Sequence, residues 1–400
     1  MKDSKLVVVG ASLAGLRTVE AARLAGHRGA ITLVGAEPHL PYDRPPLSKD
    51  FLSGMVEPPY FRGVESLRTE LGVDLQLGAP ATALDLAAGT VTVGGDLLRY
   101  DGLVLATGAR ARPLPAAGRH AGVHTLRTLD DAWRLRRALV PGAQAVIVGA
   151  GCIGIEVAYA AIRRGARPVV VEAEPVPMSR AVGAELGAAL AGVIRGHGIN
   201  LRCGVTVESF GGTDRLRSVR LSDGTELPAD LLIVGIGAAP ETGWLADSGL
   251  TIDDGVVCDE ALNAGAPGVY AAGDIARWFN PVFAAPMRLE NWTTAAEQAA
   301  LAARNAVDPA AARPCRLVPY LWSDWGTDRL QFVGLPDAEE VAMVVGAPEA
   351  GRFLAMYRRG ARVIGGLGLN HRRAILQLRT AIANGAGWAA SVREIRERWG

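Results

Sequence analysis

The feature that most constrains this chain is a pattern that it contains twice. A run of β-branched residues leads into a glycine turn, and the turn leads into an apolar-periodic stretch typical of a helix; the copies are residues 7–15 and 146–154. Each copy is followed by a second strand-like run that ends in an acid, Glu37 or Glu172. This order of elements is typical of a βαβ unit that binds a dinucleotide. Two copies predict two dinucleotides, with electrons passing between them.

The glycines of each turn have separate tasks. The first, Gly10 or Gly149, allows a tight turn; the second lets the backbone approach a pyrophosphate; the third packs the helix on the strand. Free backbone N–H groups and the positive end of the helix dipole then hold the phosphates. The first copy has Ser12 where the second has Gly151, and serine is small enough to leave the approach open. The alternative is two ordinary glycine turns in an α/β protein that binds nothing.

Composition excludes several classes of protein. A length of 400 residues predicts two or three domains, and a formal net charge of +1 argues against a nucleic-acid partner. No apolar run reaches membrane-spanning length and no signal peptide precedes the first strand, so a cytoplasmic protein with no membrane partner is expected. The four scattered cysteines predict neither an iron–sulfur cluster nor any metal site. Lys49 is the one lysine beyond the first five residues, which marks it as a candidate functional residue.

The rest of the chain has a pattern typical of alternating strands and helices, and this pattern changes near the C-terminal fifth of the sequence. The proline-rich run at 38–49 cannot be a helix interior or a central strand, so a rigid loop over a ligand is expected. From Pro319 onward, hairpin-like strands rich in aromatics predict a third, α+β domain. Between these segments we expect strands at 91–93, 103–105, 231–234 and 269–274, helices at 130–139 and 290–303, and an Asp-Gly hairpin at 218–225.

Six motifs in this order resemble one known family along essentially the whole chain. They are the two glycine turns, the Pro-Tyr-Asp-Arg-Pro-Pro-Leu-Ser-Lys run at 41–49, Ala-Thr-Gly at 106–108, Ala-Gly-Asp at 272–274, and Tyr-x-Trp-Ser-Asp at 320–324. The chain resembles the oxygenase-coupled NADH-dependent ferredoxin reductases, glutathione-reductase-type FAD flavoproteins of the putidaredoxin reductase kind. The related disulfide reductases carry a redox cysteine pair in the first domain, and this chain has no cysteine before Cys152.

The resemblance implies an α/β fold with two doubly wound Rossmann-like nucleotide-binding domains and a C-terminal α+β interface domain. The expected boundaries are 1–113 and 243–317 for a discontinuous FAD-binding domain, 114–242 for the NADH-binding domain, and 318–400 for the interface domain.

The resemblance also implies the cofactor residues. FAD would lie at the first glycine turn, with Lys49 at the flavin edge, Asp274 on the ribityl chain and Trp292 beside the isoalloxazine. In relatives the FAD ribose acid often stands at the position of Ala36; here Glu37 is expected to replace it. The full FAD set is Gly10, Ser12, Leu13, Ala14, Gly15, Glu37, Arg44, Lys49, Thr82, Ala106, Thr107, Gly108, Arg127, Gly273, Asp274, Glu290, Trp292 and Trp322. The NADH set is Gly149, Gly151, Ile153, Gly154, Glu172, Arg180, Gly235, Ile236 and Gly237.

Several of these residues have structural alternatives. Arg127 could be a solvated charge at a helix end, Asp274 a helix N-cap and Trp292 a core residue. Glu156 is expected on the first turn of a helix, where any acid is favoured by the dipole; its other interpretation is an ion pair with Lys49 near flavin N5.

The reaction implied is electron transfer from NADH through FAD to a small iron–sulfur ferredoxin that feeds a haem monooxygenase or a ring-hydroxylating dioxygenase. The alternatives are an NADH oxidase or peroxidase, and a redox-sensing binding flavoprotein of the apoptosis-inducing-factor type. Ferredoxins are typically acidic, so a basic docking face is expected. The candidates are the C-terminal arginines Arg329, Arg352, Arg358, Arg359, Arg372 and Arg373.

Overall fold

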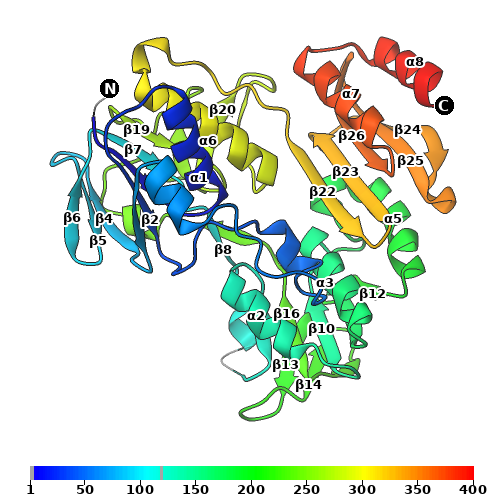
Figure 1. Ribbon diagram of the computed structural model, residues 1–400. Helices are drawn as coiled ribbons and strands as arrows, with labels where there is room; N and C mark the ends of the chain where they lie inside the picture. Colours follow the sequence, from blue (N-terminus) through cyan, green and yellow to red (C-terminus); the bar gives the residue numbers. More distant parts are fainter. Residues whose placement is uncertain (1–3, 118–119) are drawn as a thin grey trace. The chain divides into compact units, whose positions relative to one another are not determined.

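The computed structural model describes residues 4–117 and 120–400. The chain divides into two compact units, each made of three segments (Figure 1). Unit 1 is Met1–Asp43, Pro59–Arg110 and Ala239–Pro319; unit 2 is Arg44–Pro58, Ala111–Ala238 and Tyr320–Gly400. Short strands β8 (Ala109–Ala111) and β17 (Ala238–Pro240) lie where the chain passes between the units.

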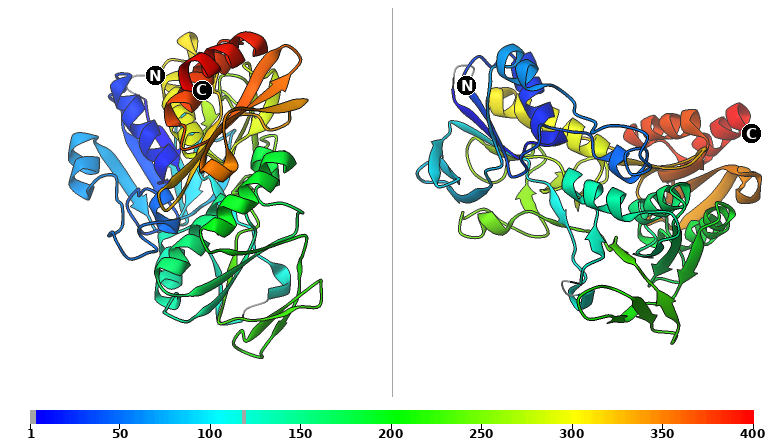
Figure 2. Two further views of the ribbon diagram at one scale, coloured as in Figure 1. Left: turned by 90° about the vertical axis from the view of Figure 1, so that its right-hand side faces the viewer. Right: turned by 60° about the horizontal axis from the view of Figure 1, so that its bottom comes forward.

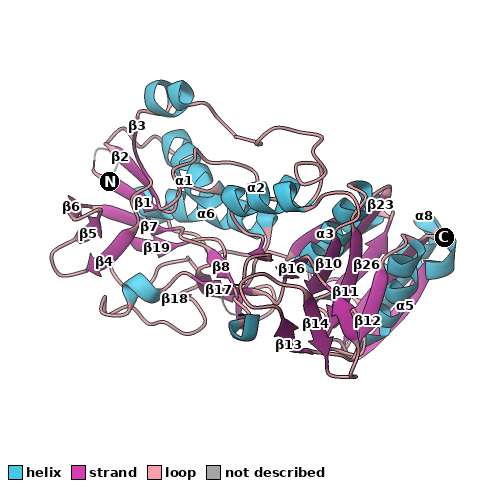
Figure 3. Ribbon diagram, turned by 90° about the horizontal axis from the view of Figure 1, so that it is seen from below, coloured by secondary structure: helices cyan, strands magenta, loops and turns pink. Residues whose placement is uncertain are grey.

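Unit 1 is built on a five-stranded parallel sheet in the order β19-β7-β1-β2-β3. Figure 3 shows these strands side by side. Their β-branched and leucine side chains are buried almost throughout, as in a parallel sheet covered on both faces. The bounds are β1 Leu6–Val9, β2 Ile31–Gly35, β3 Val73–Leu77, β7 Gly102–Leu105 and β19 Val269–Ala271.

Helices α1 (Leu13–Leu24) and α6 (Trp292–Val307) pack against each other and against this sheet. Small residues on α6, such as Ala299 and Ala302, allow the close approach. Two three-stranded sheets complete the unit: β4 (Ala81–Asp85), β5 (Thr90–Val93) and β6 (Asp96–Arg99), then β18 (Val256–Cys258), β20 (Ala276–Asn280) and β21 (Ala285–Arg288). The single-turn segments are η2 Ser66–Glu70, η4 Gly243–Leu245 and η5 Pro309–Ala311.

Unit 2 contains a second parallel sheet of the same kind, in the order β12-β11-β10-β16-β9 (Figure 3). Its strands are β9 Val123–Thr125, β10 Gln144–Val148, β11 Arg167–Glu172, β12 Asn200–Cys203 and β16 Leu231–Val234. Its helices are α2 Leu129–Ala138, α3 Cys152–Arg163, α4 Ser179–Val182 and α5 Ala184–Gly196. The predicted Asp-Gly hairpin joins two strands of an antiparallel set, β13 Val207–Gly211, β14 Ser218–Leu221 and β15 Glu226–Pro228.

The C-terminal part of unit 2 is the predicted α+β structure. Five antiparallel strands, in the order β22-β23-β26-β25-β24, carry helices α7 and α8 on one face (Figure 2). The bounds are β22 Tyr320–Trp325, β23 Asp328–Gly334, β24 Glu340–Ala347, β25 Arg352–Arg359, β26 Arg362–Leu369, α7 Arg372–Ala383 and α8 Trp388–Trp399. Short turns η3 Pro115–Ala117 and η6 Pro348–Ala350 also lie in this unit.

The proline-rich run is a loop, as predicted, with a single 3-10 turn, η1, at Pro45–Ser48. Residues 44–58 group with unit 2 rather than with the nucleotide domain that precedes them in sequence. The reason is packing: Leu52 belongs to the core shared by α3 and the antiparallel sheet, which includes Ile155 and Trp325. The predicted domain boundaries placed this loop in the first domain.

Candidate functional site

The first glycine turn joins β1 to α1 and has room for glycine only. Gly10 has φ of +120°, and a Cβ there would lie 2.1 Å from the carbonyl oxygen of Ala106. A Cβ on Gly15 would lie 1.9 Å from the carbonyl oxygen of Gly10, so the helix packs directly on the turn. Ser12 is the N-cap of α1 in extended conformation, and the first turn of the helix carries no acid. The positive end of α1 is thus available to an anion.

Two further predicted segments follow β7, which pairs with β1, and β19, which pairs with β7. Residues 106–108 follow β7 and Gly273-Asp274 follow β19, and β19, β7 and β1 are parallel neighbours. The carboxyl ends of parallel strands meet at one edge, where α/β sheets bind their ligands. A Cβ on Gly273, which has φ of +80°, would lie 3.3 Å from the Cβ of Ala14, so this segment lies directly against the start of α1.

A buried amide at this edge has an unused donor. Gln298 on α6 is fully buried, and its Oε1 accepts the N–H of Gly273 at 2.9 Å. Its Nε2 has no hydrogen-bond partner among the described residues. Because buried donors are almost always satisfied, this one indicates an acceptor that the protein itself does not supply. Together with the open helix terminus, it fits a bound FAD at this edge.

The acids and tryptophan of unit 1 are held by specific contacts. Glu37 lies just beyond β2, and its carboxylate accepts a hydrogen bond from Tyr42 at 2.6 Å. Trp292 is the first residue of α6, and its Nε1 donates to Asp43 at 2.7 Å. Asp274 is followed by strand β20 rather than by a helix, so the N-cap alternative for it is wrong.

The second glycine turn repeats the first in unit 2. Gly149 has φ of +103°, and a Cβ there would lie 2.3 Å from the carbonyl oxygen of Gly235, which follows β16. A Cβ on Gly154 would lie 2.0 Å from the carbonyl oxygen of Gly149. At Gly151, by contrast, a Cβ would meet nothing within 4 Å. The middle glycine therefore faces open space, as expected where a pyrophosphate approaches the backbone.

Glu172 at the end of β11 is bound to this turn. Its Oε2 accepts the N–H of Ala150 at 2.7 Å and its Oε1 accepts the N–H of Glu174 at 3.0 Å. Each carboxylate oxygen keeps a further acceptor direction, so the acid can still accept a hydroxyl proton. Ile153, on the first turn of α3, is 46% exposed.

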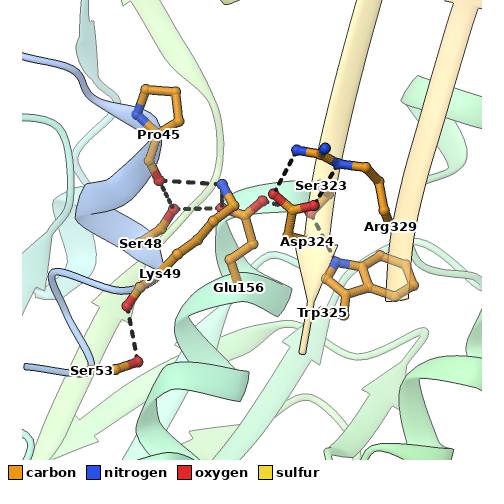
Figure 4. Close-up of polar contacts among 9 residues, drawn as sticks. All are labelled: Pro45, Ser48, Lys49, Ser53, Glu156, Ser323, Asp324, Trp325 and Arg329. Carbon is orange, nitrogen blue, oxygen red and sulfur yellow. Dashed lines mark hydrogen bonds and ion pairs between the residues drawn. The ribbon is translucent and has the colours of Figure 1, made fainter. Parts of the chain in front are cut away.

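Lys49 and Glu156 form the predicted ion pair, which lies entirely within unit 2 (Figure 4). The Lys49 Nζ lies 2.8 Å from Oε2 of Glu156, and the glutamate is 2% exposed. Glu156 is the fifth residue of α3, beyond its first turn, so the helix-dipole alternative does not account for it.

Other predicted cofactor residues are distributed over both units. Arg44 donates a hydrogen bond to the carbonyl oxygen of Arg127, and both belong to unit 2, as do Arg180 and Trp322. Thr82 is exposed on β4 of unit 1. The remaining members of both sets lie in the glycine turns or directly after the strands named above, and Glu290 pairs with Arg288 at 2.8 Å.

Cysteine chemistry has no part in either turn. Burial, with a smaller contribution from the Glu156 charge, raises the pKa of Cys152 to about 12, so its thiol stays protonated and unreactive.

The described residues contain no group of three or more acids, histidines or cysteines that could hold a metal ion. None of the described helices is long and apolar enough to cross a membrane.

Sequence reasoning missed several partners of the predicted residues. Ser48, Ser323, Tyr42 and Asp43 each bond a residue that was singled out, and the first two bond Glu156 itself. All four lie inside motifs that carried the family resemblance, which is the one signal that could have found them. Gln298 lies outside those motifs.

Comparison with known proteins agrees with this geometry. Residues 4–299 match the family described as pyridine nucleotide-disulphide oxidoreductase, and residues 320–393 match one described as reductase C-terminal. The chain is 37% identical over 337 residues to the chlorobenzene dioxygenase ferredoxin reductase component of Cupriavidus sp. (strain PS12), covering 82% of this chain and 80% of that one. It is 34% identical over 386 residues to rhodocoxin reductase of Rhodococcus erythropolis, covering 94% and 89%.

A solved structure, that of a covalent putidaredoxin reductase–putidaredoxin complex, superposes with a TM-score of 0.92 at 31% identity, over 99% of this chain and 98% of that one. The fold and its two glycine turns therefore define an FAD- and NAD(H)-dependent oxidoreductase of the pyridine nucleotide-disulphide oxidoreductase family. Within that family, the chain belongs to the ferredoxin–NAD(+) reductases of oxygenase systems.

Proposed function

We propose that this chain takes electrons from NADH and passes them through FAD to a small iron–sulfur ferredoxin, which supplies a haem monooxygenase or a ring-hydroxylating dioxygenase. The observation that carries the proposal is the presence of two glycine turns, each at the carboxyl edge of its own parallel sheet. The names of the relatives support the partner, since they include a dioxygenase component and rhodocoxin reductase. We expect the protein in the cytoplasm.

FAD, when bound, would accept a hydride and release its electrons one at a time. In this proposal the protein holds it at the edge of unit 1: the α1 terminus and the turn at Gly10–Gly15 receive the pyrophosphate, and Glu37 receives the ribose. Asp274 and the free amide donor of Gln298 would receive polar groups of the chain between the ribose and the ring. Trp292, fixed by Asp43, would line the ring.

NADH would bind at the second turn, with its pyrophosphate over Gly151 and the start of α3. Glu172 would accept the 2′-hydroxyl of the adenine ribose. The exposed side chain of Ile153 would pack against the dinucleotide. No side chain need act as an acid or base, because hydride transfer itself moves no separate proton.

Lys49 has the proposed role of a fixed positive charge beside the flavin. Its pairing with Glu156 keeps the ammonium in one place and avoids an unpaired buried carboxylate. A positive charge there would favour the reduced, anionic flavin over the neutral oxidised form.

Asp274→Ala tests the proposed FAD site. The purified wild-type protein should be yellow, with FAD that is released on denaturation. The variant should lose FAD more readily during dialysis, measured as flavin absorbance per chain, and Asp308→Ala on the same unit serves as the control. A colourless wild-type preparation that cannot be reconstituted with FAD would contradict the proposal.

A panel of purified ferredoxins tests the proposed acceptor. With a matching ferredoxin, NADH-dependent reduction of cytochrome c should be fast, and oxygen alone should be a slow acceptor. Fast oxidation by oxygen without ferredoxin would favour an NADH oxidase. Slow turnover with every acceptor, together with NADH-dependent change in association, would favour a redox-sensing binding protein.

A further inference from the structure

The Glu156 carboxylate on α3 receives three donors from two other parts of unit 2, the proline-rich loop and strand β22 (Figure 4). On Oε2 it receives Lys49 Nζ at 2.8 Å and the Ser48 hydroxyl at 2.5 Å, both from the proline-rich loop. On Oε1 it receives the Ser323 hydroxyl at 2.7 Å, from strand β22 of the antiparallel sheet. Both oxygens are therefore bound, and in a residue that is 2% exposed these contacts replace those that water would make.

The direction of the Ser323 hydrogen bond follows from its neighbour. The Trp325 Nε1 donates to the Ser323 oxygen at 2.9 Å, and an indole N–H can only donate. A serine hydroxyl has one proton, so Ser323 accepts from Trp325 and gives its own proton to Glu156. Both Ser323 and Trp325 are fully buried, so no solvent competes for either bond.

Ser323 is needed at Oε1 because the loop donors act on the other oxygen. The terminal torsion of a glutamate is broad, so a carboxylate bound at one oxygen can still rotate about its axis. A second bond from the opposite side removes that freedom. Lys49 depends on this orientation, since the other hydrogen bond of its ammonium among the described residues is a longer one, 3.2 Å to the carbonyl oxygen of Pro45.

We propose that Ser323, oriented by the Trp325 indole, is a positioning residue for Lys49. It fixes the Glu156 carboxylate from the C-terminal sheet, and the fixed carboxylate holds the ammonium. This inference rests on the proposed function, because the flavin contact of Lys49 is assigned there. It gives the C-terminal sheet a task in the reduction of the flavin in addition to any contact with a partner protein.

Ser323→Ala in the FAD-loaded, full-length protein tests the proposal by stopped-flow reduction with NADH. Losing one hydrogen bond to a charged group should slow flavin reduction about tenfold. The Kd for NADH, from the dependence of the rate on NADH concentration, should stay within about twofold. The midpoint potential of the flavin should fall, and it should fall also in Lys49→Met, which removes the positive charge. Trp325→Phe keeps the Ser323 hydroxyl but frees its direction, and should give a smaller change of the same kind. Ser391→Ala, another buried serine of unit 2, should behave as wild type.

A double-mutant cycle with Lys49→Met separates this inference from the function on which it rests. If Ser323 acts through Lys49, Ser323→Ala adds nothing in the Lys49→Met background. An equal slowing in both backgrounds, or a wild-type rate and potential in Ser323→Ala, would overturn the inference and leave the role of Lys49 intact. A wild-type rate and potential in Lys49→Met would instead overturn that role. The thermal unfolding midpoint of each FAD-loaded variant, measured alongside, shows whether a variant has simply lost its fold.

Discussion

At the scale of single residues, each βαβ unit has one acid at or just beyond the end of its second strand. The two acids are held by different partners. Glu172 is bound to its own glycine turn through the N–H of Ala150, whereas Glu37 is bound by the Tyr42 hydroxyl. The bond to the turn fixes the Glu172 carboxylate close to where a ribose would lie. A fixed negative charge there would repel a 2′-phosphate, so NADH is expected over NADPH.

Glu172→Gln tests this expectation. The amide keeps an oxygen for the N–H of Ala150 but removes the charge, so the ratio of kcat/KM for NADH to that for NADPH should fall about tenfold. The neighbouring Glu174→Gln removes an equal charge without that contact, and should leave the ratio within about twofold. Equal use of both cofactors by the wild type would contradict the role given to Glu172.

At the scale of elements, two glycines of the second glycine turn have different steric surroundings. A Cβ at Gly154 would meet backbone at 2.0 Å, whereas one at Gly151 would meet nothing within 4 Å. Gly154, the third glycine of the turn, holds the helix on the strand, and Gly151, the second, leaves room for a ligand.

The two alanine variants should therefore fail in different ways. Gly151→Ala should keep the wild-type thermal midpoint and raise the KM for NADH, because its methyl group enters the space of the pyrophosphate. Gly154→Ala should lower the midpoint by several degrees, as expected for about 1–3 kcal/mol of overpacking. Melting curves and steady-state kinetics on both variants check this, and the assignment is wrong if Gly151→Ala binds NADH normally.

The N-cap residue of helix α7 is His371, a histidine whose surroundings disfavour the protonated form. His371 is 4% exposed, and burial, together with the Arg352 charge, lowers its pKa. The unfolded chain then binds more protons than the folded one between the ordinary pKa of about 6.5 and the lowered value, so stability falls as the pH falls through that window. His124, with a pKa also lowered by burial, acts in the same direction.

His371→Asn removes this titration and supplies a favourable helix N-cap. The fall in thermal midpoint between about pH 7.5 and about pH 5.5 should be smaller in the variant than in the wild type. An unchanged fall would show that His371 does not carry it.

At the scale of the whole molecule, the formal net charge of +1 does not show which arginines are paired with carboxylates and which are not. Arg358 lies 2.8 Å from Glu340 and Arg359 lies 3.0 Å from Asp337, so these two of the six candidate docking arginines are largely neutralised. Exposed Arg372 and Arg373, at the positive end of α7, have no carboxylate partner among the described residues.

Charge reversal at both pairs tests where ferredoxin docks. Arg372→Glu with Arg373→Glu should raise the KM for ferredoxin about tenfold and weaken its salt dependence, because complementary charge steers association. Arg358→Glu with Arg359→Glu should have the smaller effect, and ferricyanide reduction by NADH should not change in either. If both double variants couple to ferredoxin as the wild type does, docking lies elsewhere.

The sequence by itself determined the repeated βαβ units, because glycine turns and buried strands are local patterns with strict steric causes. It predicted both parallel sheets, the α+β texture after Pro319, and the Lys49–Glu156 pair, the last from one lysine in an arginine-rich chain. It misplaced Glu156 on the first turn of α3, since helix boundaries depend on caps that are weak in sequence.

Tertiary structure decided which parts of the chain share a core and which donors meet at one carboxylate. The loop at 44–58 packs with unit 2 because Leu52 enters its core, and Ser323 reaches Glu156 from a strand that starts 164 residues further along the chain. Such contacts depend on how sheets and helices stack, and no local spacing encodes them. The neutralised arginines at 358 and 359 have the same origin: their acidic partners lie on and beside a neighbouring strand, and only the pairing of β24 with β25 brings them together.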